Sequence, residues 1–277
     1  MTDSVLKDAG VDVDSMVPES ARPKPPCRHY TIPLDFINKA TNVTDDEAKK
    51  VMGALQTQVD RDFGPVWGID CQLIFVGKGV IPDPGHWWLV LLDTADQAGA
   101  LGYHDLTDTG LPIGKVFVET TKADGGKWSV TSSHELMEML VDPWINLCVL
   151  TQSFPGSGNA LLLVAYEVAD APEDDKYGYE VDGVLLSDFV YPAYFEERPV
   201  SGARLDHLGH ITEQFQILPN GYLSVMQVNG AQGWQQVNNR ANIGMRRAYR
   251  DLPHIGSRRE RRRRGLTNLM KSDVLTG

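Results

Sequence analysis

Residues 131–143 read TSSHELMEMLVDP, which is the pattern of a helix with an abrupt end. Asp142-Pro143 marks the end of a helix, because proline cannot continue a helix and disfavours helical geometry in the residue before it. The sequence therefore predicts a helix that starts near Thr131, ends at Asp142 and carries the segment HELMEML.

The expected helix carries the residues of a metal site. His134 and Glu138 are four positions apart, so they share one helix face and can bind the same ion. Glu135 lies one step round the helix, beside that ion. This is the arrangement of the HExxH metallopeptidase motif, in which the glutamate acts as general base, with a glutamate in place of the second histidine. Since zinc accepts histidine nitrogen and carboxylate oxygen, the pattern HExxE predicts one Zn²⁺ per chain.

A third protein ligand must come from another part of the chain. Glu167 is the preferred candidate, with Asp170 as the alternative third ligand or as a partner that orients His134 through its other ring nitrogen. Asp174 is a weaker candidate. Asp142 lies two turns from His134, about 12 Å along the axis, so we expect it to support the site or cap the helix.

A structural alternative exists for the same glutamate. Ser132 and Glu135 have the spacing of a capping box, which would make Glu135 part of a helix start only. Acidic residues in a first turn are also favoured by the helix dipole.

Alternating apolar patterns and turn signals predict the elements around this helix. Thr44 and Glu47 form a capping box at the start of an earlier helix that should end at Gly64-Pro65. Asp182-Gly183 is the turn of a hairpin within residues 179–190. The remaining expected strands are residues 29–36, 69–77, 86–93 and 114–120, with a further apolar element at 160–170 and short strand-like pieces from about 196 to 240.

Charge divides the 277-residue chain into an acidic body and a basic tail. Residues 240–277 hold ten arginines and one lysine against three acidic residues, which gives them a charge of +8. Because the net charge of the chain is −11, residues 1–239 carry −19. An acidic body repels phosphates. Three interpretations of the tail remain: a solvated segment, a segment docked on a protein surface, or a segment that contacts nucleic acid.

The first residues and the cysteines indicate the cellular compartment that we expect for this protein. The first residues lack the basic start and apolar run of a secretory signal, and no run is long enough to span a membrane. Cys27, Cys71 and Cys148 stand singly, which favours reduced thiols. We expect a cytoplasmic protein with no membrane partner, or one associated with a virion if a phage encodes it.

The block at residues 131–143 resembles the SHELxExxxDP signature of HExxE-type metallopeptidase-like proteins of phages and bacteria. The resemblance extends over about residues 100–195, including Glu167 and Asp170, and is loose elsewhere. It implies an α+β fold with a zincin-like mixed sheet and an active-site helix. The patterns along the chain predict a flexible lead (1–27), a β-rich extension (196–240) and a basic tail (241–277), and the resemblance implies a zincin-like domain between them (28–195).

Two further residues are candidates for the substrate cleft. His104 could contact substrate there, or could be a loop histidine paired with Asp105 or backbone. Tyr177, like Tyr179, could stabilise an oxyanion, or could be an ordinary strand tyrosine. No GxSxG motif indicates a serine hydrolase.

Two functions follow from these patterns. The first is a zinc-dependent metallopeptidase whose protein or peptide substrate adds to an edge strand at residues 86–93. The second is a non-catalytic, phage-derived accessory or structural protein that keeps the zincin fold and binds virion or other protein partners.

Overall fold

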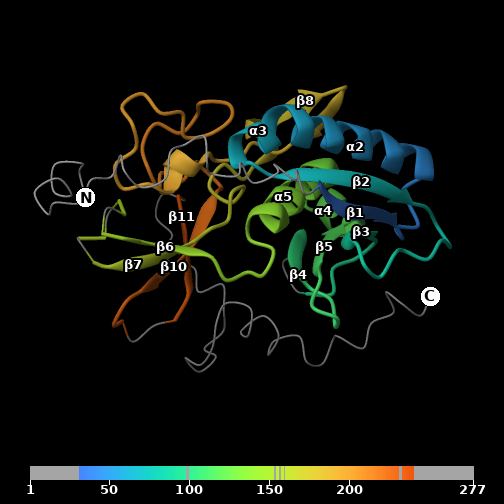
Figure 1. Cartoon of the computed structure of the whole chain (residues 1–277), viewed down its shortest axis with the longest axis horizontal. Helices are drawn as coiled ribbons and strands as arrows, with labels where there is room; N and C mark the ends of the chain where they lie inside the picture. The colour runs from blue at the N-terminus through green and yellow to red at the C-terminus, as the bar shows by residue number, and fades with distance from the viewer. Residues whose placement is uncertain are drawn as a thin grey trace, which may run out of the picture. The chain divides into compact units, whose positions relative to one another are not determined.

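The computed structural model describes residues 31–97, 100–152, 154–155, 157–158, 160–230 and 233–239. The expected lead at 1–27, with Cys27, and the tail at 241–277 lie outside these residues. The described part is a mixed α+β structure with three sheets (Figure 1). Among its helices, none is long and apolar enough to cross a membrane.

The largest sheet has five strands in the order β2-β1-β3-β5-β4. Four strands run parallel to one another, and β4 runs antiparallel to β5 at one edge. The placement of residues 86–93 at an edge is wrong, because β3 pairs with β1 on one side and with β5 on the other. The strands are β1 (Thr31–Asn38), β2 (Asp70–Val76), β3 (Trp87–Leu92), β4 (Gly102–Leu106) and β5 (Pro112–Phe117).

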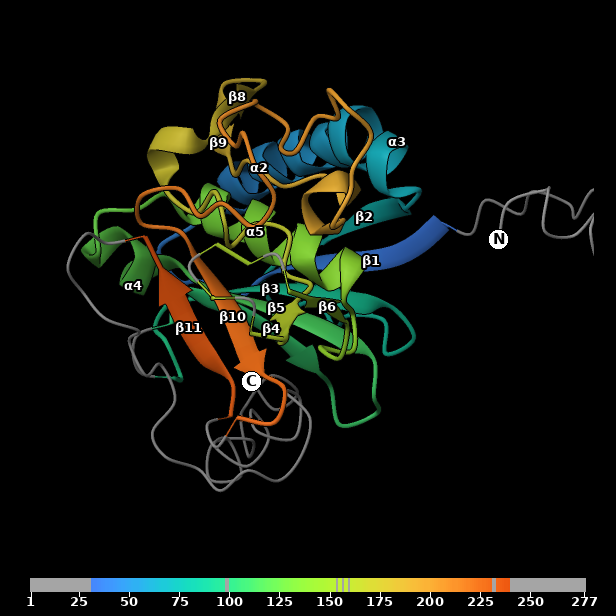
Figure 2. The same ribbon diagram turned by 90° about the vertical axis from the view of Figure 1, so that its left-hand side faces the viewer.

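Helices α2 (Asp45–Gln58) and α5 (Trp128–Val141) lie over the same face of this sheet (Figure 2). Alternate strand residues point to this face, where Phe36, Leu89 and Val116 join the main core. The residues between them, such as Val90, form a small separate cluster on the other face. Burial on both faces explains why the parallel strands are almost continuously apolar.

The start of α2 confirms the Thr44–Glu47 capping box, since both reciprocal hydrogen bonds are present. The predicted end at Gly64-Pro65 is wrong. The chain continues through a π-helical turn, η3 (Val59–Phe63), into α3 (Gly64–Trp67). Proline is accepted there because it lies in the first turn of α3, where its missing N–H is not needed.

Strand β6 (Cys148–Thr151) and two elements near the predicted helix were not expected from the sequence. Strand β4 contains His104, and a short helix α4 (Val118–Ala123) follows β5 directly. The strand predicted at 114–120 therefore begins two residues earlier and ends at Phe117.

Helix α5 begins at Trp128, three residues before the predicted start. Ser132 is consequently inside the helix, where its hydroxyl donates to the carbonyl of Trp128 at 2.8 Å. The capping-box reading of Ser132 and Glu135 is wrong for this reason. Glu135 occupies the middle of a helix and is buried there.

The second sheet has the order β11-β10-β7-β6, and all its neighbouring strands are antiparallel. Strands from the region after residue 196 therefore share one sheet with strands that precede it. The four strands are β6 (Cys148–Thr151), β7 (Leu162–Ala165), β10 (Tyr222–Gln227) and β11 (Gln235–Asn238).

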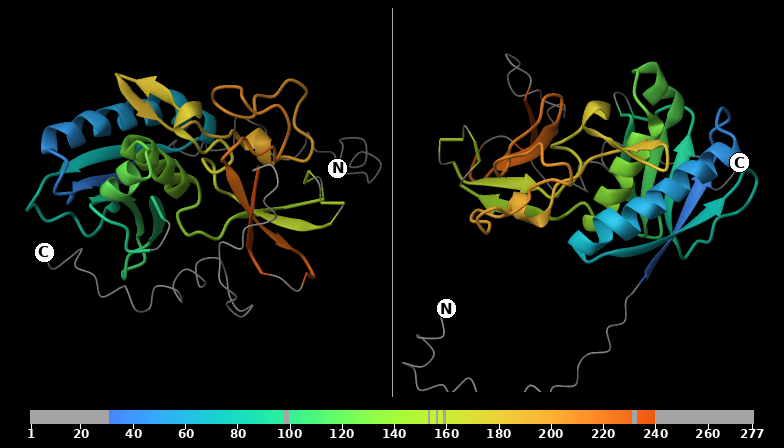
Figure 3. Two further views of the ribbon diagram at one scale, coloured as in Figure 1. Left: turned by 180° about the vertical axis from the view of Figure 1, so that it is seen from behind. Right: turned by 90° about the horizontal axis from the view of Figure 1, so that it is seen from above.

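The predicted hairpin forms between β8 (Tyr179–Val181) and β9 (Val184–Leu186). Asp182 and Gly183 both have positive φ, at 51° and 71°, as a two-residue hairpin turn of this kind requires. The hairpin packs against both α2 and α5 (Figure 3). Two short 3₁₀ turns, η4 (Asp175–Tyr177) and η5 (Pro192–Phe195), flank it in the sequence.

Candidate metal centre

Helix α5 brings His134 and Glu138 together as their spacing predicts. His134 Nε2 lies 3.3 Å from Glu138 Oε1, one helical turn further on. Both side chains are buried, with 6% and 4% of the residue surface exposed.

Asp170 completes this first group of ligand atoms. Its Oδ1 lies 3.3 Å from His134 Nε2. The segment after β7 is fixed on two sides, because the Ala169 N–H donates to Glu138 Oε1 at 3.3 Å and the Tyr222 N–H donates to the Asp170 carbonyl at 3.0 Å. The residue that the structure brings to His134 is therefore Asp170, the alternative third ligand of the sequence analysis.

The spacing of this group fits a metal ion. Two atoms that each lie about 2.1 Å from a tetrahedral zinc ion are roughly 3.4 Å apart. Both distances from His134 Nε2 are 3.3 Å, and the three ligand atoms lie within 4.8 Å of one another. His134, Glu138 and Asp170 are thus a buried group that could hold a metal ion.

A second group of the same kind lies beside the first. His104 Nδ1 is 3.6 Å from Glu135 Oε2 and 3.8 Å from Glu138 Oε2. These three residues also place ligand atoms within 4.8 Å of one another. His104 is in strand β4 and is only 1% exposed, so the loop placement considered for it is wrong.

Glu167 lies on the far side of His104. Its Oε2 is 3.9 Å from His104 Nε2, the ring nitrogen that points away from Glu135. The preferred third ligand of the sequence analysis therefore adjoins His104 in the structure. We call the six residues together the histidine–carboxylate centre: His104, His134, Glu135, Glu138, Glu167 and Asp170.

Strand β4 approaches α5 closely at Gly102. A Cβ atom at this position would lie 2.7 Å from Thr131 Cγ2 and 2.8 Å from both Glu135 Cγ and Oε1. Only glycine allows this approach without displacement of the Glu135 side chain. The contact holds β4, and with it His104, against the helix.

A small polar cavity of about 40 Å³ opens onto the centre. A single water needs roughly 10–15 Å³ of such space, so the cavity can hold an ion with associated water. Carboxylates dominate the lining, and β10 and β11 close the other side. The lining residues are Gly102, Tyr103, Glu135, Glu138, Glu167, Asp170, Tyr222, Ser224 and Gln236.

The pKa values of both His134 and Asp170 are raised in the first group. Burial disfavours the charged imidazole, but Glu138, together with hydrogen bonds to Asp170 and Glu138, raises the pKa of His134 well above its usual range. Burial and the nearby Glu138 raise the pKa of Asp170 to about 7. A cation bound here must displace a proton, so metal affinity should fall with falling pH.

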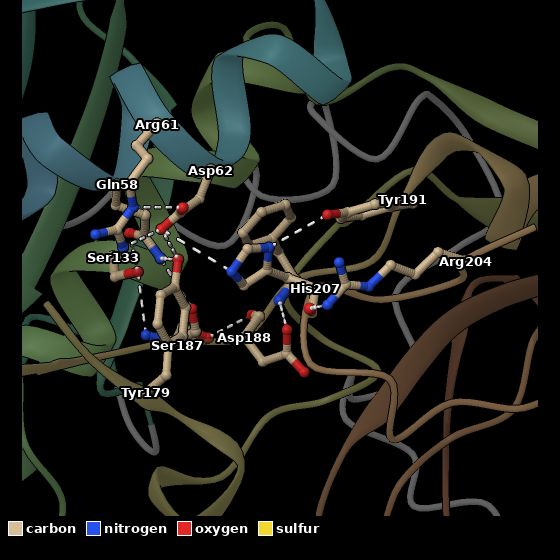
Figure 4. Close-up of polar contacts among 11 residues, drawn as sticks. Gln58, Arg61, Asp62, Ser133, Tyr179, Ser187, Asp188, Tyr191, Arg204 and His207 are labelled. Atoms are coloured by element: carbon tan, nitrogen blue, oxygen red, sulfur yellow. Dashed lines mark hydrogen bonds and ion pairs between the residues drawn. The ribbon is translucent and has the colours of Figure 1, made fainter.

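A polar network holds α5 from another side (Figure 4). Ser133, next to His134 in sequence, donates to Gln58 Oε1 at 2.7 Å and accepts from the Ser187 N–H at 3.1 Å. These bonds fix the rotation of the helix that presents His134. We call the set the Asp62–His207 network, and its labelled members are Gln58, Arg61, Asp62, Ser133, Tyr179, Ser187, Asp188, Tyr191, Arg204 and His207.

Four residues considered from sequence have other surroundings. The Asp142 carboxylate accepts from the N–H groups of Asn146 and Leu147, so it caps the turn after α5. Asp174 caps η4 by accepting from the Lys176 N–H. Tyr177 packs on the His210 ring at 5.4 Å, and the Tyr179 hydroxyl donates to Asp62 at 2.9 Å.

Sequence reasoning did not identify the ligand role open to His104, or the cavity residues Tyr222, Ser224 and Gln236. The antiparallel pairing of His104 with Gly114 is a contact between strands, which a local pattern does not encode. The segment GYHDL shows no alternation of apolar and polar residues, so no local signal placed His104 in a strand.

Neither a family model, nor a curated protein, nor a solved structure matches this chain. Its function is therefore inferred from the geometry of the histidine–carboxylate centre.

Proposed function

We propose that this chain is a zinc-dependent hydrolase of the metallopeptidase type. The observation that supports it is the convergence of His134, Glu138 and Asp170 at zinc-ligand spacing in a buried position. Two of these residues also line the cavity that could admit water.

The chemistry is divided between the ion and one side chain. A bound zinc ion supplies Lewis acidity, which lowers the pKa of a water molecule and polarises a carbonyl group. Glu135 lines the same cavity as Glu138 and Asp170, so its carboxylate is placed to accept the proton of that water. The protonated Glu135 would then act as a general acid and give the proton to the leaving amine.

Burial favours a second candidate function. Each of the six residues of the centre is at most 6% exposed. A closed site is typical of structural zinc, whereas a catalytic site keeps an open position. In this alternative the ion stabilises a non-catalytic accessory protein that binds other proteins, including those of a virion.

Zinc content measured by elemental analysis tests the metal site. The wild-type protein should retain zinc after dialysis, and His134→Ala should lose the ion that His134 binds. Absence of zinc from both proteins after incubation with the metal would overturn the proposal and its alternative together.

Hydrolysis of unfolded casein by protein loaded with one equivalent of zinc separates the two functions. Wild type should cleave, and Glu135→Gln should not, although it keeps the zinc held by His134. Equal cleavage by both proteins would exclude Glu135 as the base. A zinc-loaded wild type that cleaves nothing would support the structural role. Glu180→Gln, at an exposed position of strand β8, is the matched control and should cleave like wild type.

A further inference from the structure

We propose that the centre binds a second divalent cation through His104 Nδ1, Glu135 and Glu138, with Glu138 bridging the two ions. This proposal rests on the proposed function, because both ions share Glu138. It adds a dinuclear site to the single zinc ion that the motif on α5 predicts.

The two carboxylate oxygens of Glu138 face different histidines. Oε1 lies 3.3 Å from His134 Nε2, and Oε2 lies 3.8 Å from His104 Nδ1. A carboxylate that divides its oxygens in this way has the geometry of a bridge between two ions. A glutamate at position 138 can therefore contact two ions, whereas a histidine could not, because an imidazole directs only one ring nitrogen at the centre.

The second group is slightly wider than the first. Its distances from His104 Nδ1 are 3.6 and 3.8 Å, against the roughly 3.4 Å expected between tetrahedral zinc ligands. The ligands must move inward by a few tenths of an ångström to bind an ion. We therefore expect the second ion to bind more weakly than the first.

Glu167 lies on the side of His104 where a metal-binding histidine usually has a supporting carboxylate, at 3.9 Å, which is longer than a hydrogen bond. Such a histidine directs one ring nitrogen at the ion and the other at a carboxylate, which fixes the tautomer and the ring orientation. His104 directs Nδ1 at Glu135 and Glu138, and Nε2 faces Glu167 Oε2 at 3.9 Å. The adjoining cavity offers space for the ion, and Glu135 and Glu138 line it.

Charge is consistent with two ions. Four ionised carboxylates carry a charge of −4, which two divalent cations match. Paired ions in hydrolases are typically about 3.5–4 Å apart and share such carboxylates. When the second position is filled, Glu135 is a ligand, and its role as a general base applies to the chain with one ion.

Calorimetric titration of the metal-free full chain with zinc tests the proposal. Wild type should bind two equivalents, the second at least ten-fold more weakly. His104→Gln should bind one equivalent and keep the tighter event, whereas His134→Ala should lose the tighter event. His210→Ala is the control for removal of an exposed imidazole outside the centre and should bind two equivalents.

The outcomes distinguish this proposal from the proposed function. One equivalent in wild type and in His104→Gln would overturn the second ion and leave the first. Two equivalents in His104→Gln would place the second ion elsewhere and also overturn it. No binding in wild type would overturn both.

A measurement on wild type alone guards against misfolding of the variants. Cobalt(II) replaces zinc as a paramagnetic probe, and the protein is loaded with one or two equivalents. Magnetic coupling should appear only at the second equivalent, because a shared carboxylate connects the two ions. Two equivalents of bound cobalt without coupling would contradict the bridge.

Discussion

The histidine–carboxylate centre and the Asp62–His207 network meet at neighbouring residues of α5, yet they balance charge differently. In the network, Asp62 receives two bonds of 2.7 Å from Arg61 and one of 2.9 Å from the Tyr179 hydroxyl. In the centre, the ion pairs among described residues join carboxylates only to histidine, at 3.3 to 3.9 Å.

The distances explain the difference in role. Charge-assisted hydrogen bonds are about 2.7–2.9 Å long, which is the length found at Asp62. The separations in the centre are longer than hydrogen bonds of this kind and close to those between ligands of one ion. Arginine also keeps its charge at any ordinary pH, whereas histidine can release its proton to make way for a metal. We infer that the Asp62–His207 network positions α5 and that the histidine–carboxylate centre binds a metal ion.

The largest effect should follow from Glu138→Gln, since this residue belongs to both ligand groups. Loss of a supporting residue outside a metal site typically weakens affinity about 10–100-fold, so loss of the shared ligand should exceed 100-fold. Competition with a chelator of known zinc affinity measures the change. A loss of zinc affinity below ten-fold would contradict the ligand role of Glu138, and with it the difference in function between the centre and the network.

In the network, Asp188 should make stability depend on pH. Burial and the neighbouring Asp206 raise the pKa of the Asp188 carboxyl to about 8. The folded protein then binds more protons than the unfolded protein between about pH 4 and pH 8. The free energy of unfolding should therefore fall across this range as pH rises.

Asp188→Asn should flatten that decrease and be more stable than wild type at pH 8.5, by on the order of a few kcal/mol. Asparagine can still accept the Phe189 N–H, which donates to Asp188 Oδ1 at 2.7 Å. Urea unfolding with a chelator present measures the effect free of metal. Parallel pH profiles of the two proteins would contradict the role of this carboxyl pair.

Gly102→Ala should have a smaller effect, and its site should be the centre. The added methyl would press on Thr131 and Glu135, which should cost about 1–3 kcal/mol of stability and weaken the second zinc-binding event. Gly53→Ala is the matched control, because its Cβ meets nothing within 4 Å on helix α2. This control should raise stability by about 0.5–1 kcal/mol. Equal effects in thermal unfolding would argue against the tight contact at Gly102.

Local signals predicted the parts of this molecule that depend on neighbours in sequence. The Thr44 capping box, the Asp182-Gly183 turn and the shared helix face of His134 and Glu138 each involve residues within one turn. The predicted end of the first helix was wrong, because Pro65 lies in the first turn of a new helical segment that follows a π-helical turn.

The contacts between distant segments were not available from such patterns. The central position of β3, the strand at His104 and the choice of Asp170 beside His134 depend on how strands pair and where the segment after β7 passes α5. Glu167 and Asp170 are only three positions apart, and the sequence analysis preferred Glu167 as the third ligand. They differ in the structure, because each faces a different histidine.

The candidate ligands come from β4, α5 and the segment after β7, and that segment is tied to β10 near Tyr222. Neither candidate ligand group is complete until these elements have assembled, so a cation that binds here would join late in folding. In the folded protein, the same enclosure would slow the release of a bound ion. An ion held behind β10 can leave only as fast as this part of the chain opens, and its exchange rate would report that opening directly.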